Sequence, residues 1–94
     1  MKLRITARAN RDLQDIASYL NSRNPPAAVL VRERIERALQ LLVAAPKIGR
    51  MSERAGLREF PVRDLPYLIV YRVNMDAVEV LAVFHGARNP ENKP

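Results

Sequence analysis

Arginine is the residue type through which this chain offers most of its chemistry. Of its 94 residues, 16 are lysine or arginine and 10 are aspartate or glutamate, which gives a formal net charge of +6. Only Lys2, Lys47 and Lys93 are lysines. The guanidinium group forms rigid bidentate pairs with carboxylates and phosphates, so an anionic partner is expected, either a nucleic acid or an acidic protein.

The arginines of the last third of the chain accompany three segments that alternate as β-strands do. Alternation places Arg72 on the same side of its strand as Leu68 and Val70. The side chains that are candidates for contacting a target are Arg58, Arg63, Arg72, His85 and Arg88. The alternative is that these arginines lie at the rim of the sheet and pair with nearby acidic residues, namely Glu59, Asp64 and Glu79.

His85 is the only histidine and is expected at the end of the last strand. Arginine keeps its proton in proteins and the chain has no cysteine, so a general base would have to be His85 or a carboxylate such as Glu53 or Glu59. A lone histidine is more often structural, and no catalytic residue is favoured. One histidine without cysteine also forms no cluster of metal ligands, so neither a metal nor a cofactor is expected.

Two tyrosines, Tyr67 and Tyr71, lie four residues apart on one face of a predicted strand. They would suit stacking on bases or contact with a phosphate. Paired aromatic residues within an apolar strand more often belong to the core, and this interpretation is favoured.

The elements that position these residues begin with a short strand at residues 2–5. Thr6 is a suitable N-cap for a helix that starts near Ala7, and its buried face is predicted to hold Leu13, Ile16, Ala17 and Leu20. Residues 21–26 end that helix, and Asn24 is placed to cap a second helix that runs to about Ala45. The two helices are expected to form a tight hairpin.

The second helix is predicted to bury a stripe made of Ala28, Val31, Ile35, Ala38, Leu39 and Leu42. Leu30 and Leu41 fall outside this stripe. With the stems of Arg34 and Arg37 they would form an exposed apolar track on which a partner helix could dock. The alternative, a wider buried face that includes both leucines, is favoured.

The segment 47–56 has no sustained period and is interpreted as a loop. Three strands are predicted after it, at residues 57–62, 66–73 and 77–84, and Pro61 indicates that the first of them is an edge or is bulged there. The order β-α-α-β-β-β predicts an α+β fold, with a helical hairpin packed on a small antiparallel-rich sheet. We expect a single domain over residues 1–94 with a C-terminal tail from about 86. No membrane span or signal peptide is expected, and a cytoplasmic location fits.

Several short motifs, in this order and spacing, resemble the RelE/ParE toxin superfamily. They are Asp12-Leu13-X-X-Ile16 with Tyr19-Leu20, Asn24-Pro25, Pro46-X-X-Gly49-Arg50, Leu57-Arg58-Glu59-Phe60, Pro66-Tyr67-X-X-X-Tyr71 and Val83-Phe84-His85-Gly86-Ala87-Arg88. The resemblance spans almost the whole chain. The Pro66–Arg72 strand and the His85–Arg88 end are most similar to the ParE branch.

The resemblance implies the toxin of a type II toxin-antitoxin pair, neutralised by an antitoxin whose acidic C-terminal segment wraps the toxin and whose other part binds promoter DNA. It implies inhibition of DNA gyrase by binding for a ParE-like member, and ribosome-dependent mRNA cleavage for a RelE-like one. For a RelE-like nuclease, the nearest candidates by position are His85, Arg72 and Arg58. The loop at 47–56 lacks the lysine cluster of RelE and no tyrosine follows His85, which favours the ParE-like function. An inactive homologue that only regulates is a third possibility. The candidates for antitoxin contact are Leu30, Arg34, Arg37, Leu41, Arg58 and Arg72.

Overall fold

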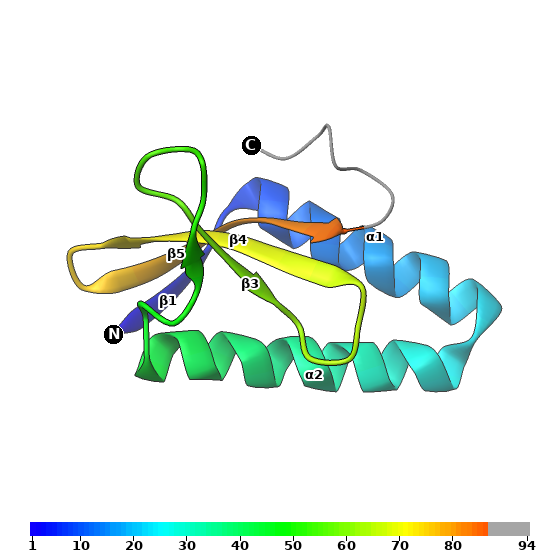
Figure 1. Ribbon diagram of the computed structural model, residues 1–94. Coiled ribbons are helices and arrows are strands. Elements are labelled where there is room, and N and C mark those ends of the chain that lie inside the picture. Colours follow the sequence, from blue (N-terminus) through cyan, green and yellow to red (C-terminus); the bar gives the residue numbers. More distant parts are fainter. Residues whose placement is uncertain (87–94) are drawn as a thin grey trace.

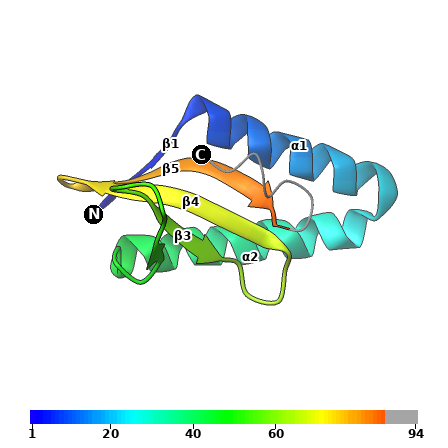
Figure 2. The same ribbon diagram turned by 45° about the horizontal axis from the view of Figure 1, so that its top comes forward.

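Two helices lie alongside each other across one face of a five-stranded sheet in the computed structural model, which describes residues 1–86 (Figures 1 and 2). The elements in chain order are β1 (Lys2–Ile5), α1 (Ala7–Arg23), α2 (Pro25–Ala44), β2 (Arg50–Met51), β3 (Arg58–Pro61), β4 (Tyr67–Asn74) and β5 (Ala77–His85). The predicted α+β class and the predicted order are confirmed. The one addition is β2, which lies in the segment that was expected to be a loop.

The helical hairpin is tight because one residue serves both helices. The backbone N–H of Asn24 donates to Leu20 O (2.6 Å) at the end of α1, and its side chain accepts a hydrogen bond from Ala27 N (3.2 Å) at the start of α2. Thr6 caps α1 in the same way by accepting from Ala9 N (3.2 Å). Both predicted caps are confirmed.

The sheet has the strand order β1-β5-β4-β3-β2, and β1–β5 is the parallel pair. The other pairs are antiparallel, as the prediction of an antiparallel-rich sheet requires. The two-residue strand β2 pairs only with Arg58 and Glu59 of β3. Among residues 1–86, the far side of β3 therefore has no strand neighbour at Pro61, where a missing N–H costs no ladder hydrogen bond. The expectation of an edge at Pro61 is confirmed.

The core lies between the helices and one face of the sheet. It contains the predicted helix residues Val31, Ile35, Ala38, Leu39 and Leu42 together with the strand residues Tyr67, Ile69, Tyr71, Val78, Val80 and Val83. Both tyrosines are buried, which confirms the core interpretation. Leu30 and Leu41 are 46% and 47% exposed. The favoured prediction of a wider buried face was therefore wrong, because the sheet reaches only one side of α2.

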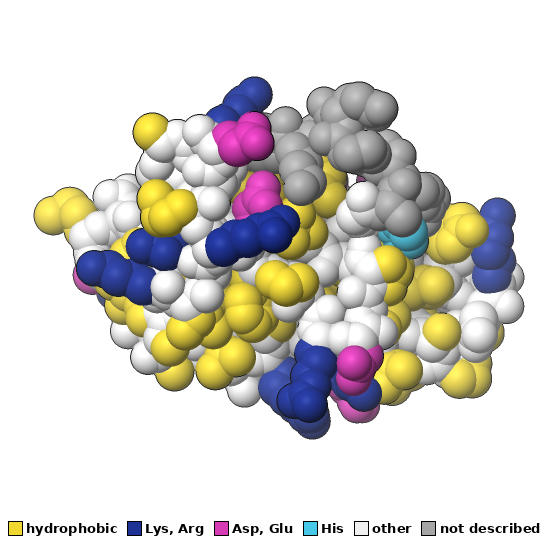
Figure 3. All heavy atoms as spheres, viewed as in Figure 1, with side chains coloured by type: hydrophobic (Ala, Val, Ile, Leu, Met, Phe, Trp, Pro, Cys, Tyr) yellow, Lys and Arg dark blue, Asp and Glu magenta, His cyan; other side chains and the backbone are white. Residues whose placement is uncertain are grey.

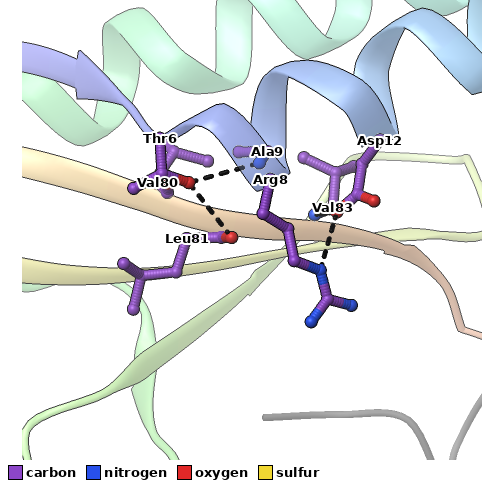
Figure 4. A network of polar contacts seen from close by, with 7 residues as sticks. All are labelled: Thr6, Arg8, Ala9, Asp12, Val80, Leu81 and Val83. Atoms are coloured by element: carbon purple, nitrogen blue, oxygen red, sulfur yellow. Dashed lines mark hydrogen bonds and ion pairs between the residues drawn. The ribbon is translucent and has the colours of Figure 1, made fainter.

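Side chains of α1 occupy the edge of β5 beyond the end of β1 (Figure 4). The register between β4 and β5 shifts there, because Val70 pairs with Ala82 and Tyr71 with Val80. The hydroxyl of Thr6 donates to Val80 O (2.9 Å) and contacts Leu81 O (3.3 Å), and Asp12 Oδ2 accepts from Val83 N (3.0 Å). The start of α1 thus satisfies backbone groups that a longer β1 would have paired.

Neither helix of residues 1–86 combines the length and the apolar character that crossing a bilayer requires. The predicted tail from about 86, apart from Gly86, lies outside the described residues, as does Arg88.

Candidate functional site

The sheet face opposite the helices carries two cross-strand ion pairs. Arg72 Nε donates to Glu79 Oε1 at 2.6 Å, and Arg50 donates to Glu59 Oε1 from two nitrogens at 3.1 and 3.2 Å. The hydrogen bond from Arg72 lowers the pKa of Glu79 below its usual 4.5. For Arg72, the structure therefore matches the alternative of a rim arginine paired with an acidic neighbour.

Arg58 and Tyr71 together hold the segment 46–49 against the sheet. Arg58 Nη1 donates to Lys47 O (3.2 Å) and to Gly49 O (2.8 Å). The Tyr71 hydroxyl donates to Pro46 O (2.7 Å) and accepts from Gly49 N (2.9 Å). We call this arrangement the 46–49 clamp. Burial raises the pKa of Tyr71 above its ordinary value of 10.0, so the phenol stays protonated and able to donate.

The clamp requires glycine at position 49. A Cβ on Gly49 would overlap the Tyr71 hydroxyl and would lie 2.7 and 2.9 Å from two ring carbons. Real Cβ atoms do not approach buried groups so closely, and the ring is held within the core. The Gly49 in the motif Pro46-X-X-Gly49-Arg50 is therefore explained by packing against Tyr71.

His85 ends β5 and is partly buried. Its ring meets the ring of Tyr67, its cross-strand partner, in an edge-to-face contact with centroids 5.5 Å apart. Its Nδ1 is buried and has no hydrogen-bond partner within the described part of the chain. Contact with an aromatic ring holds the imidazole in place, and no carboxylate of residues 1–86 hydrogen-bonds to its buried Nδ1.

The three residues of the nuclease hypothesis do not meet at one point. Arg72 lies five residues along β4 from Tyr67, the partner of His85, which is about 17 Å of extended strand. Arg58 pairs with Tyr71, which faces the helices, whereas Arg72 faces away from them. Residues that share a reacting group must lie within hydrogen-bond reach of it. The three residues are therefore not assembled for one reaction in this structure.

A basic cleft lies between α2 and the β3–β4 turn. Its volume is about 870 Å³, and it is lined by Arg34, Arg37, Ala38, Gln40, Leu41, Phe60, Arg63 and Asp64. Arg34 Nη1 donates to Arg63 O (3.1 Å) and pairs with Asp64 Oδ2 (3.5 Å). Figure 3 shows basic side chains gathered beside acidic ones at the lower edge of the molecule, over α2. The cleft brings together three antitoxin candidates, Arg34, Arg37 and Leu41, and one target candidate, Arg63.

An apolar groove, which the sequence analysis missed, lies between β1 and the two helices. Its volume is about 500 Å³, and its lining includes Leu3, Ile5, Leu13, Ile16, Leu20 and Leu39. Leu3 and Ile5 are 40% and 38% exposed because β1 is the edge strand. Their alternation with Lys2 and Arg4 was visible in the sequence, but only the strand order shows that no strand covers them.

Residues 1–86 contain no group of three histidine, cysteine, aspartate or glutamate side chains placed to hold a metal ion.

Comparison with solved structures defines the class of this fold. A chain of the chromosomal ParDE TA system from P. aeruginosa superposes with a TM-score of 0.79 and 26% sequence identity, over 90% of this chain and 95% of that chain. A helical hairpin packed on a mixed five-stranded sheet is thus the fold of a RelE/ParE superfamily toxin.

The family follows from the sequence comparisons. The model of the family described as "ParE toxin of type II toxin-antitoxin system, parDE" matches residues 3–90, and the chain belongs to that family. "Putative toxin Y4kP" of Sinorhizobium fredii is 39% identical, over 90% of this chain and 88% of its own length. Toxin RelE1 of Caulobacter vibrioides is 34% identical, over 87% of this chain and 89% of its own length.

Proposed function

We propose that this toxin inhibits DNA gyrase by binding to it and without catalysis. The proposal rests on the contacts that the structure shows for the residues that a nuclease would need. Arg72 is paired with Glu79, Arg58 is part of the 46–49 clamp, and His85 packs on Tyr67 at the far end of the β4–β5 hairpin. Their structural roles support a function that depends on surface recognition.

Among the described target candidates, Arg63 has the most available guanidinium group. It is exposed on the β3–β4 turn and has no acidic partner in residues 1–86. Arg58, Arg72 and His85 are engaged in the contacts within the toxin that are given above. Arg88, the fifth candidate, lies outside the described residues. We therefore assign the principal contact with the target to Arg63.

For the antitoxin, we propose that an acidic amphipathic segment near its C-terminus docks along α2. Leu30, Arg34, Arg37 and Leu41 follow a helical spacing of four, three and four residues, so they lie on one face of α2. Both leucines are nearly half exposed, and the two arginines between them attract carboxylates. Arg58 and Arg72, the other candidates, are engaged internally. Binding to promoter DNA would occur through the antitoxin.

The test is induction of the toxin without its antitoxin, followed by pulse incorporation of labelled thymidine and methionine within minutes. We expect DNA synthesis to fall first, and purified toxin to inhibit the supercoiling of relaxed plasmid by gyrase. His85→Ala and Arg72→Met are expected to retain both effects, while Arg63→Glu weakens them. Thermal unfolding of each variant, followed by circular dichroism, provides the control for folding. Early loss of methionine incorporation would contradict the proposal.

The second candidate function is ribosome-dependent cleavage of mRNA, and the similarity to toxin RelE1 over most of the chain favours it. This function predicts that His85→Ala or Arg72→Met lowers cleavage by about 10²–10⁴-fold while antitoxin binding is preserved. If neither DNA synthesis nor protein synthesis falls after induction, the protein is an inactive homologue that acts only in complex with its antitoxin.

A further inference from the structure

The basic cleft holds more positive charge than its own acidic residue can neutralise. Arg34, Arg37 and Arg63 face one carboxylate, that of Asp64. Asp64 adopts a left-handed conformation (φ 62°), which an aspartate tolerates at a turn, and its carboxylate is committed to Arg34. Arg37 and Arg63 are exposed and have no acidic partner in the described part of the chain.

The two arginines come from different elements, which gives the cleft a defined shape. Arg37 projects from α2, one turn beyond Arg34, and Arg63 belongs to the turn that follows β3. The hydrogen bond from Arg34 to Arg63 O joins these two elements, because it holds the backbone of the β3–β4 turn against α2. The partly buried ring of Phe60 lines the same cleft.

We propose that the basic cleft binds the phosphodiester backbone of nucleic acid, with Arg37 and Arg63 as the phosphate ligands. Arginine forks match phosphate oxygens, and an aromatic ring beside them offers a surface on which a base stacks. The net charge of +6 draws a polyanion toward the cleft from a distance.

This inference extends the proposed function, because gyrase acts on DNA, and it adds a mode of regulation. Arg37 and Leu41 belong both to the basic cleft and to the face of α2 assigned to the antitoxin. An acidic segment docked on α2 would occupy the site of the phosphates. Nucleic acid and antitoxin are therefore expected to exclude each other.

The test uses fluorescence anisotropy of the purified toxin with a labelled DNA duplex of 20 base pairs and with the RNA strand of the same sequence, between 50 and 200 mM NaCl. The variant is Arg37→Ala with Arg63→Ala. The matched control is Arg11→Ala with Arg54→Ala, which removes the same charge from exposed positions outside the cleft. Comparing the two probes shows whether the cleft prefers duplex DNA or single-stranded RNA.

We expect the cleft variant to bind at least about 10-fold more weakly at 100 mM NaCl, and its salt dependence to fall by about 2 in the slope of log K against log salt. The control variant should retain most of the affinity. Equal losses in both variants, or a wild-type affinity that does not depend on salt, would overturn the inference. The inference would also be overturned if the toxin binds an acidic 20-residue helical peptide through Arg37 and Arg63 but binds neither the DNA probe nor the RNA probe.

Supercoiling assays on the same preparations separate this inference from the proposed function. If the toxin inhibits gyrase but its cleft binds no nucleic acid, the cleft inference fails and gyrase inhibition stands. If the cleft binds nucleic acid but gyrase is unaffected, the proposed target is wrong and the cleft inference stands.

Discussion

Replacing Tyr71 by phenylalanine tests the 46–49 clamp, because it removes one oxygen atom and leaves the ring in the core. The Gly49 N–H loses a buried hydrogen bond of 2.9 Å, and Pro46 O loses one of 2.7 Å. An unsatisfied buried donor costs about 1–3 kcal/mol, and a carbonyl that water still reaches costs less. We expect the free energy of unfolding to fall by about 2–3 kcal/mol, which for a domain of this size lowers the midpoint by about 10–20 °C.

The assay is urea and thermal unfolding of the wild type and of Tyr71→Phe, with Gly49→Ala as the second mutation of a double-mutant cycle. Gly49→Ala alone should destabilise strongly because its Cβ overlaps the Tyr71 hydroxyl. Its cost should fall in the Tyr71→Phe background, where the nearest atom is absent. Additive effects, or a loss below about 0.5 kcal/mol for Tyr71→Phe, would refute the clamp.

The pH dependence of stability gives the same test an independent readout. Burial raises the pKa of Tyr71 in the folded protein above the unfolded value of 10.0. Its stabilising contribution is therefore complete below pH 10 and is lost as the pH rises through the folded pKa. The wild type should lose stability more steeply than Tyr71→Phe as the pH rises above 10. Parallel curves would contradict the assignment.

Two further predictions concern the ends of β5. Asp12→Ala should lower the free energy of unfolding by about 1–2 kcal/mol, because the partly buried N–H of Val83 loses its acceptor. Asp12→Asn keeps an acceptor oxygen and should cost less than half as much. The midpoints of urea unfolding measure both effects. The pKa of Glu79 is lowered by Arg72, so this pair stabilises the fold above about pH 4.5 and its contribution is lost as the pH falls through the folded pKa. In Arg72→Met the free energy of unfolding should therefore fall less steeply than in the wild type as the pH is lowered from 5 to 3. An unchanged pH dependence in this range would contradict this reasoning.

Most elements of the fold could be predicted because each has a local signal. Thr6 and Asn24 are caps with polar side chains, and Pro25 follows Asn24 where a helix tolerates it. The alternation of residues 66–73 marked β4. The strand β2 has two residues and therefore no period to detect. Its formation depends on pairing with Arg58 and Glu59, which are brought near only by the complete fold.

The site was less predictable because the sequence names residues but not their partners. Arg58 and Arg72 were equally prominent in the sequence, yet one holds a loop and the other is paired with Glu79. The exposed position of Leu41 depends on how far the sheet extends under α2, which no local pattern records. The basic cleft joins positions from α2 and from the β3–β4 turn, so only the tertiary structure could place Arg37 and Arg63 together.

The parallel pairing of β1 with β5 affects how the chain folds while it is being synthesised. Thr6 reaches Val80 across a separation of 74 residues, and β5 is the only strand in the described part of the chain that pairs with β1. A chain still emerging from the ribosome therefore holds its first strand without a partner until β5 has been synthesised. Such long-range closure comes late and slowly in folding. The five-stranded sheet of the toxin is consequently completed only after β5 has been synthesised.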